Sequence, residues 1–198
     1  MPKIVDHANR REEIAHVACQ VVAEYGFRQA TIARIARAAG YTTGMVAHYF
    51  DSKQDIVLAA LRLILTRIDQ RLKRRQRESD ADLLAVLSEA LALDRQRYIE
   101  CAFWMAFWGQ VSADKSLRRL NAWVHREYQR LFARCFASHW PESAGWSKTV
   151  RDQVLRSVVT FINGLTASAV TSPADWPAAT QIAQLRLQLQ LLHQWAEE

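Results

Sequence analysis

The sequence contains few of the residues that break helices. Among its 198 residues there are 6 glycines and 4 prolines, and no proline occurs between Pro2 and Pro141. Because proline and glycine mark the turns of loop-rich β proteins, this scarcity argues against a β-sandwich or a barrel. The hydrophobic share of 50% is enough for a substantial buried core. We therefore expect an all-α protein.

Cysteine and long apolar runs are also scarce. Cys19, Cys101 and Cys135 are odd in number and far apart, and neither a CxxC nor a zinc-type spacing occurs. We expect reduced, mostly buried thiols, no metal site and no cofactor. No run approaches the length of a membrane span, and the N-terminal residues are too polar for a signal peptide. These absences predict a cytoplasmic protein without a membrane partner.

Surplus positive charge is confined to the first part of the chain. Residues 1–77 contain 14 Lys and Arg against 7 Asp and Glu, whereas residues 78–198 contain 12 against 13. This asymmetry indicates an anionic partner for the N-terminal part, with nucleic acid as the first candidate.

Apolar residues at three- and four-residue spacing, with capping residues and glycines between them, predict helices along the whole chain. Ser52 followed by Asp55 is typical of a capping box that opens a long helix. We expect one domain over residues 1–55, a connecting helix over about 52–77 and a second, larger domain over 78–198. The expected helices are near 10–25, 31–39, 42–50, 52–77, 81–94, 97–111, 115–138, 147–170 and 178–195.

The stretch TIARIARAAGYTTGMVAHYF, residues 31–50, predicts two short helices joined by a tight turn. Gly40 can adopt the positive φ that such a turn requires. Ile35, Val46 and Phe50 are spaced to form a small core between the two helices. The outward residues of the second helix are then small or polar, which is the layout of a helix-turn-helix whose second helix enters the major groove of DNA.

Seven residues of this region are candidates for contacts with double-stranded DNA. Three of them suit phosphates, because they lie at the ends of the helices, and the others lie on the outward face that would meet base edges. The phosphate candidates are Thr31, Tyr49 and Lys53, and the groove-facing candidates are Thr42, Thr43, Gly44 and His48.

The segment TIARIARAAGYTTGMVAHYFDSK, residues 31–53, resembles the N-terminal DNA-binding signature of the TetR family of bacterial transcriptional regulators. The resemblance implies an all-helical homodimer whose first three helices bind operator DNA, whose fourth helix leads to a larger ligand-binding domain, and whose last two helices form the dimer interface. It further implies repression that ends when a small-molecule inducer binds. Many members carry tyrosine where this sequence has Ala47.

The stretch CAFWMAFWG, residues 101–109, places two aromatic stripes on one helix. It resembles the choline-responsive, BetI-like branch of the family, and aromatic faces are what holds a quaternary ammonium ion. The alternative is that these rings are ordinary core or dimer packing. The branch tends to have Asp-Gly-Leu-Trp where this chain has Asn163-Gly164-Leu165-Thr166. The candidate cage residues are Phe103, Trp104, Phe107, Trp108, Trp123 and Phe161.

The last two predicted helices are candidates for dimerisation. The final helix has an apolar face wider than a surface helix needs, and the helix before it has small residues near Ala167. Together they can form a four-helix bundle between two subunits, and such a dimer reads a palindromic operator. The candidate residues are Val159, Ala167, Val170, Leu185, Leu189 and Leu192.

These features predict a homodimeric, ligand-responsive DNA-binding regulator, most simply a repressor. One alternative is a nucleoid-type protein that binds DNA without a ligand. Another is a small all-α enzyme with an aromatic substrate pocket, although no nucleophile–base pair, metal cluster or paired carboxylate stands out, and we name no catalytic residue.

Overall fold

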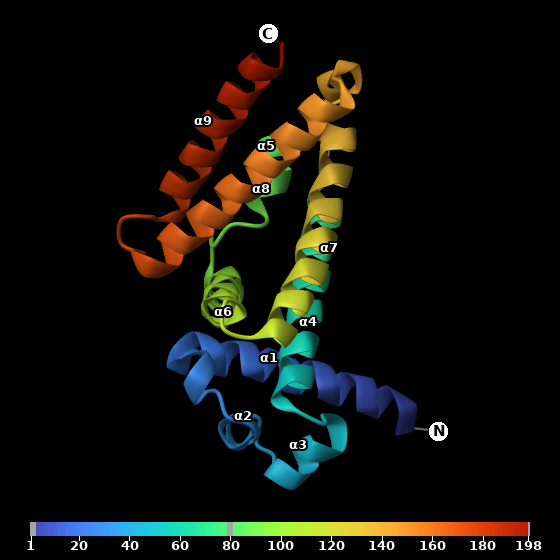
Figure 1. The fold of residues 1–198 in the computed structure, drawn as a ribbon, viewed down its shortest axis with the longest axis vertical. Coiled ribbons are helices and arrows are strands. Elements are labelled where there is room, and N and C mark those ends of the chain that lie inside the picture. Colours follow the sequence, from blue (N-terminus) through green and yellow to red (C-terminus); the bar gives the residue numbers. More distant parts are fainter. Residues whose placement is uncertain (1–2, 79–80, 198) are drawn as a thin grey trace. The chain divides into compact units, whose positions relative to one another are not determined.

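Helices make up the regular structure of residues 3–78 and 81–197, which this computed structural model describes, and no strand occurs among them (Figure 1). This confirms the all-α prediction. In chain order the elements are α1 (Lys3–Gln29), α2 (Ile32–Ala38), α3 (Thr43–Tyr49), α4 (Lys53–Arg75), α5 (Leu83–Ser88), α6 (Arg95–Val111), α7 (Lys115–His139), the 3₁₀-helix η1 (Pro141–Gly145), α8 (Lys148–Thr171) and α9 (Ala178–Glu197).

The chain divides into two compact units. The first unit comprises Met1–Thr66 and Ala102–Ala122, and the second comprises Arg67–Cys101 and Trp123–Glu198. Each passage of the chain from one unit to the other therefore lies inside a helix, in α4, α6 or α7.

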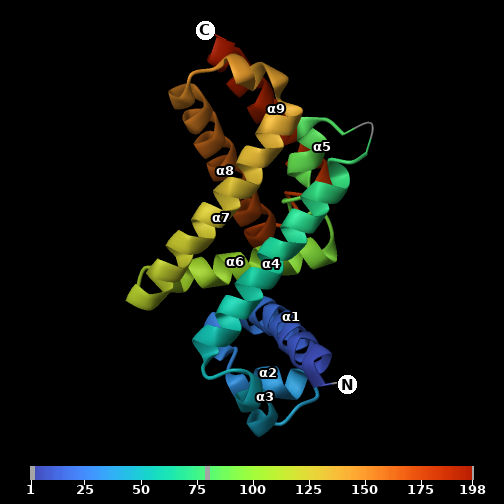
Figure 2. The ribbon, with the colours of Figure 1, turned by 90° about the vertical axis from the view of Figure 1, so that its right-hand side faces the viewer.

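In the first unit, α1 packs against α2 and α3 (Figure 2). Ile35, Val46 and Phe50 are at most 3% exposed, which confirms the small core predicted for the helix-turn-helix. Gly26 interrupts α1 with a φ of +77°, and Gly40 has a φ of +74° in the turn between α2 and α3. Both glycines thus occupy backbone conformations that side-chain-bearing residues adopt at a cost.

In the second unit, α9 lies alongside α8 in both views of the ribbon (Figures 1 and 2). Val158 and Ile162 of α8 and Leu185 of α9 have no exposed surface, so the two helices share a core. Hydrophobic burial of this kind contributes about 25 cal/mol for each Å² of apolar surface removed from water.

The prediction of one helix over residues 81–94 is wrong. Helix α5 ends at Ser88, and α6 begins at Arg95 after its own cap, in which the Asp94 carboxylate accepts a hydrogen bond of 2.8 Å from the Arg97 backbone. Between them, the amide side chain of Gln181 accepts from Ala92 N–H at 3.1 Å and donates to its carbonyl at 3.2 Å. The backbone of residue 92 is therefore satisfied by a distant side chain, which local periodicity does not reveal.

Helix α8 also corrects the expectation about membrane spans. It is long enough and apolar enough to cross a membrane by length and composition, with a mean hydropathy of 1.3 over its most apolar window. Seven of its residues, among them Val154 and Leu165, are buried inside the chain, as in a core helix of a globular protein.

All three cysteines are buried, as predicted. Burial raises the pKa of the Cys101 thiol to about 12 and that of Cys135 to about 11, so both are neutral thiols at physiological pH.

Candidate DNA-binding and ligand-binding residues

The N-termini of α2 and α3 are capped by two of the predicted DNA-contacting threonines. Thr31 Oγ1 accepts from Arg34 N–H at 3.2 Å, and Thr42 Oγ1 accepts from Met45 N–H at 3.1 Å. A threonine hydroxyl that accepts a capping bond still has its own O–H to donate. Each exposed threonine therefore stabilises its helix and keeps a hydroxyl donor for another acceptor.

The outward face of α3 carries the predicted groove-facing residues. Thr42, Thr43, Gly44 and His48 are all exposed, whereas Val46 on the opposite face has no exposed surface. Met45 is also exposed, at 36%, and was not among the predicted contacts. The helix thus presents a small, mostly polar surface while its apolar side locks it to the unit.

Tyr49 and Lys53 are held by contacts within the protein. The Tyr49 ring lies against His7 and His48, with centroid separations of 4.8 and 5.3 Å. Lys53 Nζ donates to the Phe27 carbonyl at 2.5 Å, and desolvation lowers the pKa of this lysine. Because an ammonium group has three donors, this bond leaves two for another acceptor.

Two arginines of α1, which the sequence interpretation missed, brace α3, the second helix of the helix-turn-helix and its recognition helix. The guanidinium of Arg11 donates to the Tyr49 carbonyl and to Asp55 Oδ1 at 3.1 Å, and it lies 4.2 Å from the Phe50 ring centroid. Ser52 Oγ caps Asp55 N–H at 3.1 Å, but the Asp55 carboxylate turns to Arg11. These bonds tie the end of α3 and the start of α4 to α1.

Arg10, Glu13 and Tyr41 form a second brace, at the start of α3. Tyr41 O–H donates to Glu13 Oε2 at 2.7 Å, and Arg10 donates to both partners. The hydrogen bonds from Tyr41 and Arg10 lower the pKa of Glu13, and the bond to the carboxylate raises the pKa of Tyr41. No local sequence pattern links residues that lie 28 positions apart.

The two aromatic stripes of α6 differ in burial. Phe103 and Phe107 have no exposed surface, whereas Trp104 and Trp108 are half-buried with ring centroids 5.8 Å apart. Trp108 Nε1 donates to Asn121 Oδ1 at 3.1 Å. Within the first unit the phenylalanines are thus core side chains, and the tryptophans form an adjoining pair with accessible surface.

The other two candidate cage residues belong to the second unit. Trp123 is half-buried on α7. Phe161 lines an open groove beside Leu165 and Trp176, together with polar residues of α8 and α9. The structure therefore does not bring Phe161 and the α6 tryptophans together within one unit.

The predicted dimerisation residues fall into two groups. Val159, Leu185 and Leu189 are buried within this single chain, at 1%, 0% and 9% exposure. Ala167, Val170 and Leu192 are half-buried. The exposed apolar side chains of α9 are instead Leu187, Leu191 and Trp195, with exposures of 49%, 53% and 46%.

Comparison with known families identifies the chain. Residues 14–60 match the family described as bacterial regulatory proteins, tetR family, and residues 79–194 match the BetI-type transcriptional repressor, C-terminal family. The chain belongs to the TetR family. More narrowly, its C-terminal part is that of a BetI-type repressor, and this confirms the predicted regulator over the predicted alternative of an enzyme.

Individual relatives agree with this family assignment. The HTH-type transcriptional regulator BetI of Pseudomonas aeruginosa is 29% identical over 202 residues, covering 98% of this chain and 99% of the relative. Two solved structures of transcriptional regulators share the fold. A transcriptional regulator from Rhodococcus sp. Rha1 has a TM-score of 0.79 at 24% identity, over 95% of this chain and 98% of that one. A putative regulator from Saccharomonospora viridis, in complex with choline, has a TM-score of 0.76 at 19% identity, over 92% and 96%.

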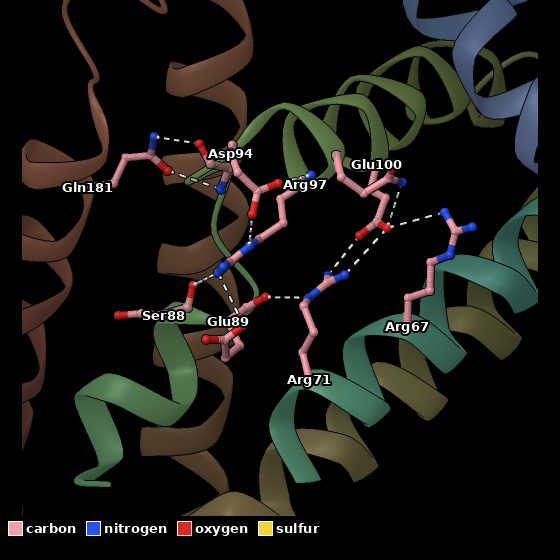
Figure 3. Close-up of polar contacts among 10 residues, drawn as sticks. Arg67, Arg71, Ser88, Glu89, Asp94, Arg97, Glu100 and Gln181 are labelled. Atoms are coloured by element: carbon pink, nitrogen blue, oxygen red, sulfur yellow. Dashed lines mark hydrogen bonds and ion pairs between the residues drawn. The ribbon is translucent and has the colours of Figure 1, made fainter. Parts of the chain in front are cut away.

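The BetI-type part of this TetR-family chain contains a buried acidic residue that the sequence interpretation missed. Glu100 is 2% exposed and is bound by arginines of α4 (Figure 3). It stands three and seven positions before Phe103 and Phe107, so a carboxylate occupies a core position of their stripe. That placement is the sequence signal that could have revealed it.

Proposed function

We propose that this TetR-family protein is a cytoplasmic, homodimeric repressor that binds a palindromic operator through α3 and leaves it when a small molecule binds. In this proposal residues 1–55 are the DNA-binding domain, residues 52–77 the connecting helix, and residues 78–198 the ligand-binding and dimerisation domain. The observation that carries it is the exposed face of α3, braced at both ends by arginines of α1.

In this proposal, two sets of residues in the first unit have different roles in DNA binding. Thr43 and His48 face outward in the middle of the exposed surface and meet base edges. Thr31, Tyr49 and Lys53 lie at helix ends and meet phosphates, which position the protein without reading sequence. Thr42 and Gly44 complete the groove-facing surface.

The test starts from an operator selected out of random double-stranded DNA by the purified protein. Thr43→Ala and His48→Ala each weaken binding about 5- to 150-fold and relax the preference at one base pair. Lys53→Ala weakens binding to every sequence and lowers the salt slope by about 1. Arg119→Ala, an exposed arginine of α7 in the same unit, is the matched control. Fluorescence anisotropy at several salt concentrations measures all four.

A protein that shows a steep salt dependence and no preferred sequence contradicts the proposal. That result supports the ligand-independent nucleoid-type binder, the alternative from the sequence.

For the dimer, we assign a second copy of the chain to the α8–α9 face. The support is a groove that contains Phe161 and Trp176 and, on α9, three exposed apolar residues at four-residue spacing, Leu187, Leu191 and Trp195. Large apolar side chains that share an exposed helix face favour association. This placement of Phe161 favours a role in the interface over a role in the ligand cage.

Leu191→Arg tests the interface, because a charge at this position is desolvated on association. We expect a monomer in size-exclusion chromatography with light scattering, with wild-type helicity. Ala137→Arg, also an exposed apolar-to-arginine change but on α7, leaves the dimer intact. An L191R protein that stays dimeric at micromolar concentration excludes this face.

For the ligand, we propose a quaternary ammonium compound such as choline. The support is the BetI-type match and the half-buried Trp104–Trp108 pair, since indole faces attract cations by about 0.5–2 kcal/mol each. Asn163, where the branch tends to have Asp, contributes no charge to such a site.

Tryptophan fluorescence titrated with choline tests the ligand, and the uncharged isostere 3,3-dimethylbutanol is the control. The proposed site on Trp104 and Trp108 is supported if choline quenches the fluorescence saturably, the isostere does not, and Trp104→Leu or Trp108→Leu abolishes the quenching. Equal responses to choline and the isostere show that charge is not recognised and direct the search to neutral ligands.

A further inference from the structure

Glu100 lies where two helices pass out of the second unit. Helix α4 enters this unit at Arg67, and α6 leaves it after Cys101. Arg67 and Arg71 on α4 and Glu100 on α6 therefore stand within a few residues of two of the three passages to the DNA-binding unit.

The contact between these helices is a buried ion pair supported by several hydrogen bonds (Figure 3). Arg71 Nη2 lies 2.7 Å from Glu100 Oε2, and its Nη1 lies 3.4 Å from Oε1. Gln96 Nε2 donates to Oε1 at 3.2 Å, and Arg67 Nη1 is 3.7 Å from the same oxygen. Both carboxylate oxygens are thus satisfied, and the charge of Glu100 is neutralised from α4.

The same cluster reaches the end of α5. Arg71 Nε donates to the Glu89 carbonyl at 3.2 Å, and the Arg97 guanidinium is 3.2 Å from Glu89 Oε2 and 2.7 Å from Asp94 Oδ2 (Figure 3). Helices α4 and α6 are therefore joined directly by Glu100 and also through the residues that follow α5.

A buried ion pair is a poor choice if stability alone is required. An apolar pair of similar volume stabilises a core as well or better, because no charge has to be desolvated. Its advantage is specificity, since a bidentate guanidinium–carboxylate contact fixes the register of two helices where apolar side chains permit sliding. Glu100 occupies a core position on the same stripe of α6 as Phe103 and Phe107, which suits a residue that fixes the register of α4 and α6.

We propose that Glu100 and Arg71 form a coupling joint, which transmits effector binding at α6 through α4 to operator binding by α3. Both are positioning residues: they act by holding α4 and α6 in one register. This inference rests on the proposed effector-responsive repressor.

The test replaces the pair by apolar residues in the double variant Arg71→Met/Glu100→Leu. This variant removes both charges, so the protein folds with a urea midpoint close to that of the wild type. The matched control is Lys148→Met/Asp152→Leu, which removes an exposed ion pair of α8 in the same unit. The probe is choline, and the readout is the ratio of operator affinities without and with it.

In the wild type and the control we expect choline to weaken operator binding about 5- to 150-fold, the usual range of allosteric coupling. In R71M/E100L we expect the ratio to fall below about 2-fold, although choline still quenches tryptophan fluorescence. A double variant that keeps the wild-type ratio overturns the joint.

A second readout does not depend on choline being the effector. Because coupling is reciprocal, operator binding must also change α6, and hydrogen exchange in residues 95–101 of that helix reports the change. We expect that change in the wild type and the control and its loss in R71M/E100L. Its persistence in the double variant, or its absence in the wild type, overturns the joint. If operator binding changes hydrogen exchange in the wild type but choline does not change operator affinity, only the proposed ligand is rejected. If the wild type selects no operator, the proposed function itself is rejected.

Discussion

The recognition helix and the cluster around Glu100 use polar side chains in opposite ways. In α3 the polar residues Thr43 and His48 are exposed, and the one buried side chain is apolar, Val46. Around Glu100 the charges are withdrawn from water and satisfied by partners from other helices. Exposed polar groups are free to meet a partner molecule, whereas buried ones commit a helix to one neighbour. A regulator needs both, one to bind DNA and one to hold a defined state.

The largest effect that would test this contrast is the loss of one partner of the buried pair. Glu100→Ala leaves Arg71 with its charge largely buried and uncompensated, and we expect a loss of about 3–5 kcal/mol of unfolding free energy. Glu127→Ala, which breaks a more exposed pair with Arg130, costs less than about 1 kcal/mol. Urea denaturation compares the two, and equal costs would remove the distinction between the pairs.

Replacing glycine by alanine is expected to change stability in opposite directions at two positions, and the pair tests the backbone of the helix-turn-helix. Gly40→Ala destabilises by about 1–2 kcal/mol, because the turn requires its φ of +74°. Gly109→Ala stabilises by about 0.5–1 kcal/mol, because this exposed glycine is helical. An added Cβ meets no atom within 4 Å at either position, so the difference is conformational. Thermal unfolding measures both, and a shift of the same sign contradicts the assignment.

The cap of α3 gives a smaller effect on the exposed side of the comparison. Thr42→Ala removes the acceptor of Met45 N–H and costs about 1 kcal/mol, whereas Thr42→Ser retains the hydroxyl and most of the stability. Operator affinity should fall in T42A beyond the effect of stability, because the proposed complex places this hydroxyl against the groove. If T42S and T42A bind equally, Thr42 makes no contact with DNA.

The smallest expected effect is that Cys101, which follows Glu100 in the chain, does not react with a thiol reagent in the folded protein. Since burial raises the pKa of Cys101 from 9.0 to about 12, the folded protein holds almost no thiolate there at pH 8. We expect iodoacetamide to modify Cys101 only after unfolding in urea, as measured by peptide mass spectrometry. The same linkage predicts a stability contribution that is complete below pH 9 and is lost as the pH rises from 9 towards 12. Rapid labelling of the native protein at pH 8 would show that water reaches this interior.

Much of the helix-turn-helix could be predicted because its signals are local. Thr42 caps a helix three residues away, Gly40 permits a turn within its own peptide, and Val46 repeats the helical period of its neighbours. Its braces could not be predicted, since Arg11 reaches Asp55 across 44 positions and Tyr41 reaches Glu13 across 28. Periodicity carries no information about such partners.

The C-terminal predictions were less specific for the same reason. Periodicity identified the wide apolar face of α9 but did not show that this chain buries Leu185 and Leu189 itself and leaves Leu187 and Leu191 exposed. The sequence pattern does not distinguish the two stripes of α6, whereas in the structure Phe103 and Phe107 are buried and the tryptophans are half-buried. An amphipathic pattern reveals that a face will be buried and not what will cover it.

The sequence by itself determined the all-α class, the caps and turn of the helix-turn-helix, the polar face of α3 and the resemblance to the TetR family, because these depend on residues within a few positions of one another. Only the tertiary structure decided which aromatic stripe is core, where α5 ends, which leucines of α9 stay exposed, and that Glu100 meets Arg71. These outcomes depend on side chains brought together from distant helices, where burial turns a modest electrostatic attraction into a constraint on the register of two helices.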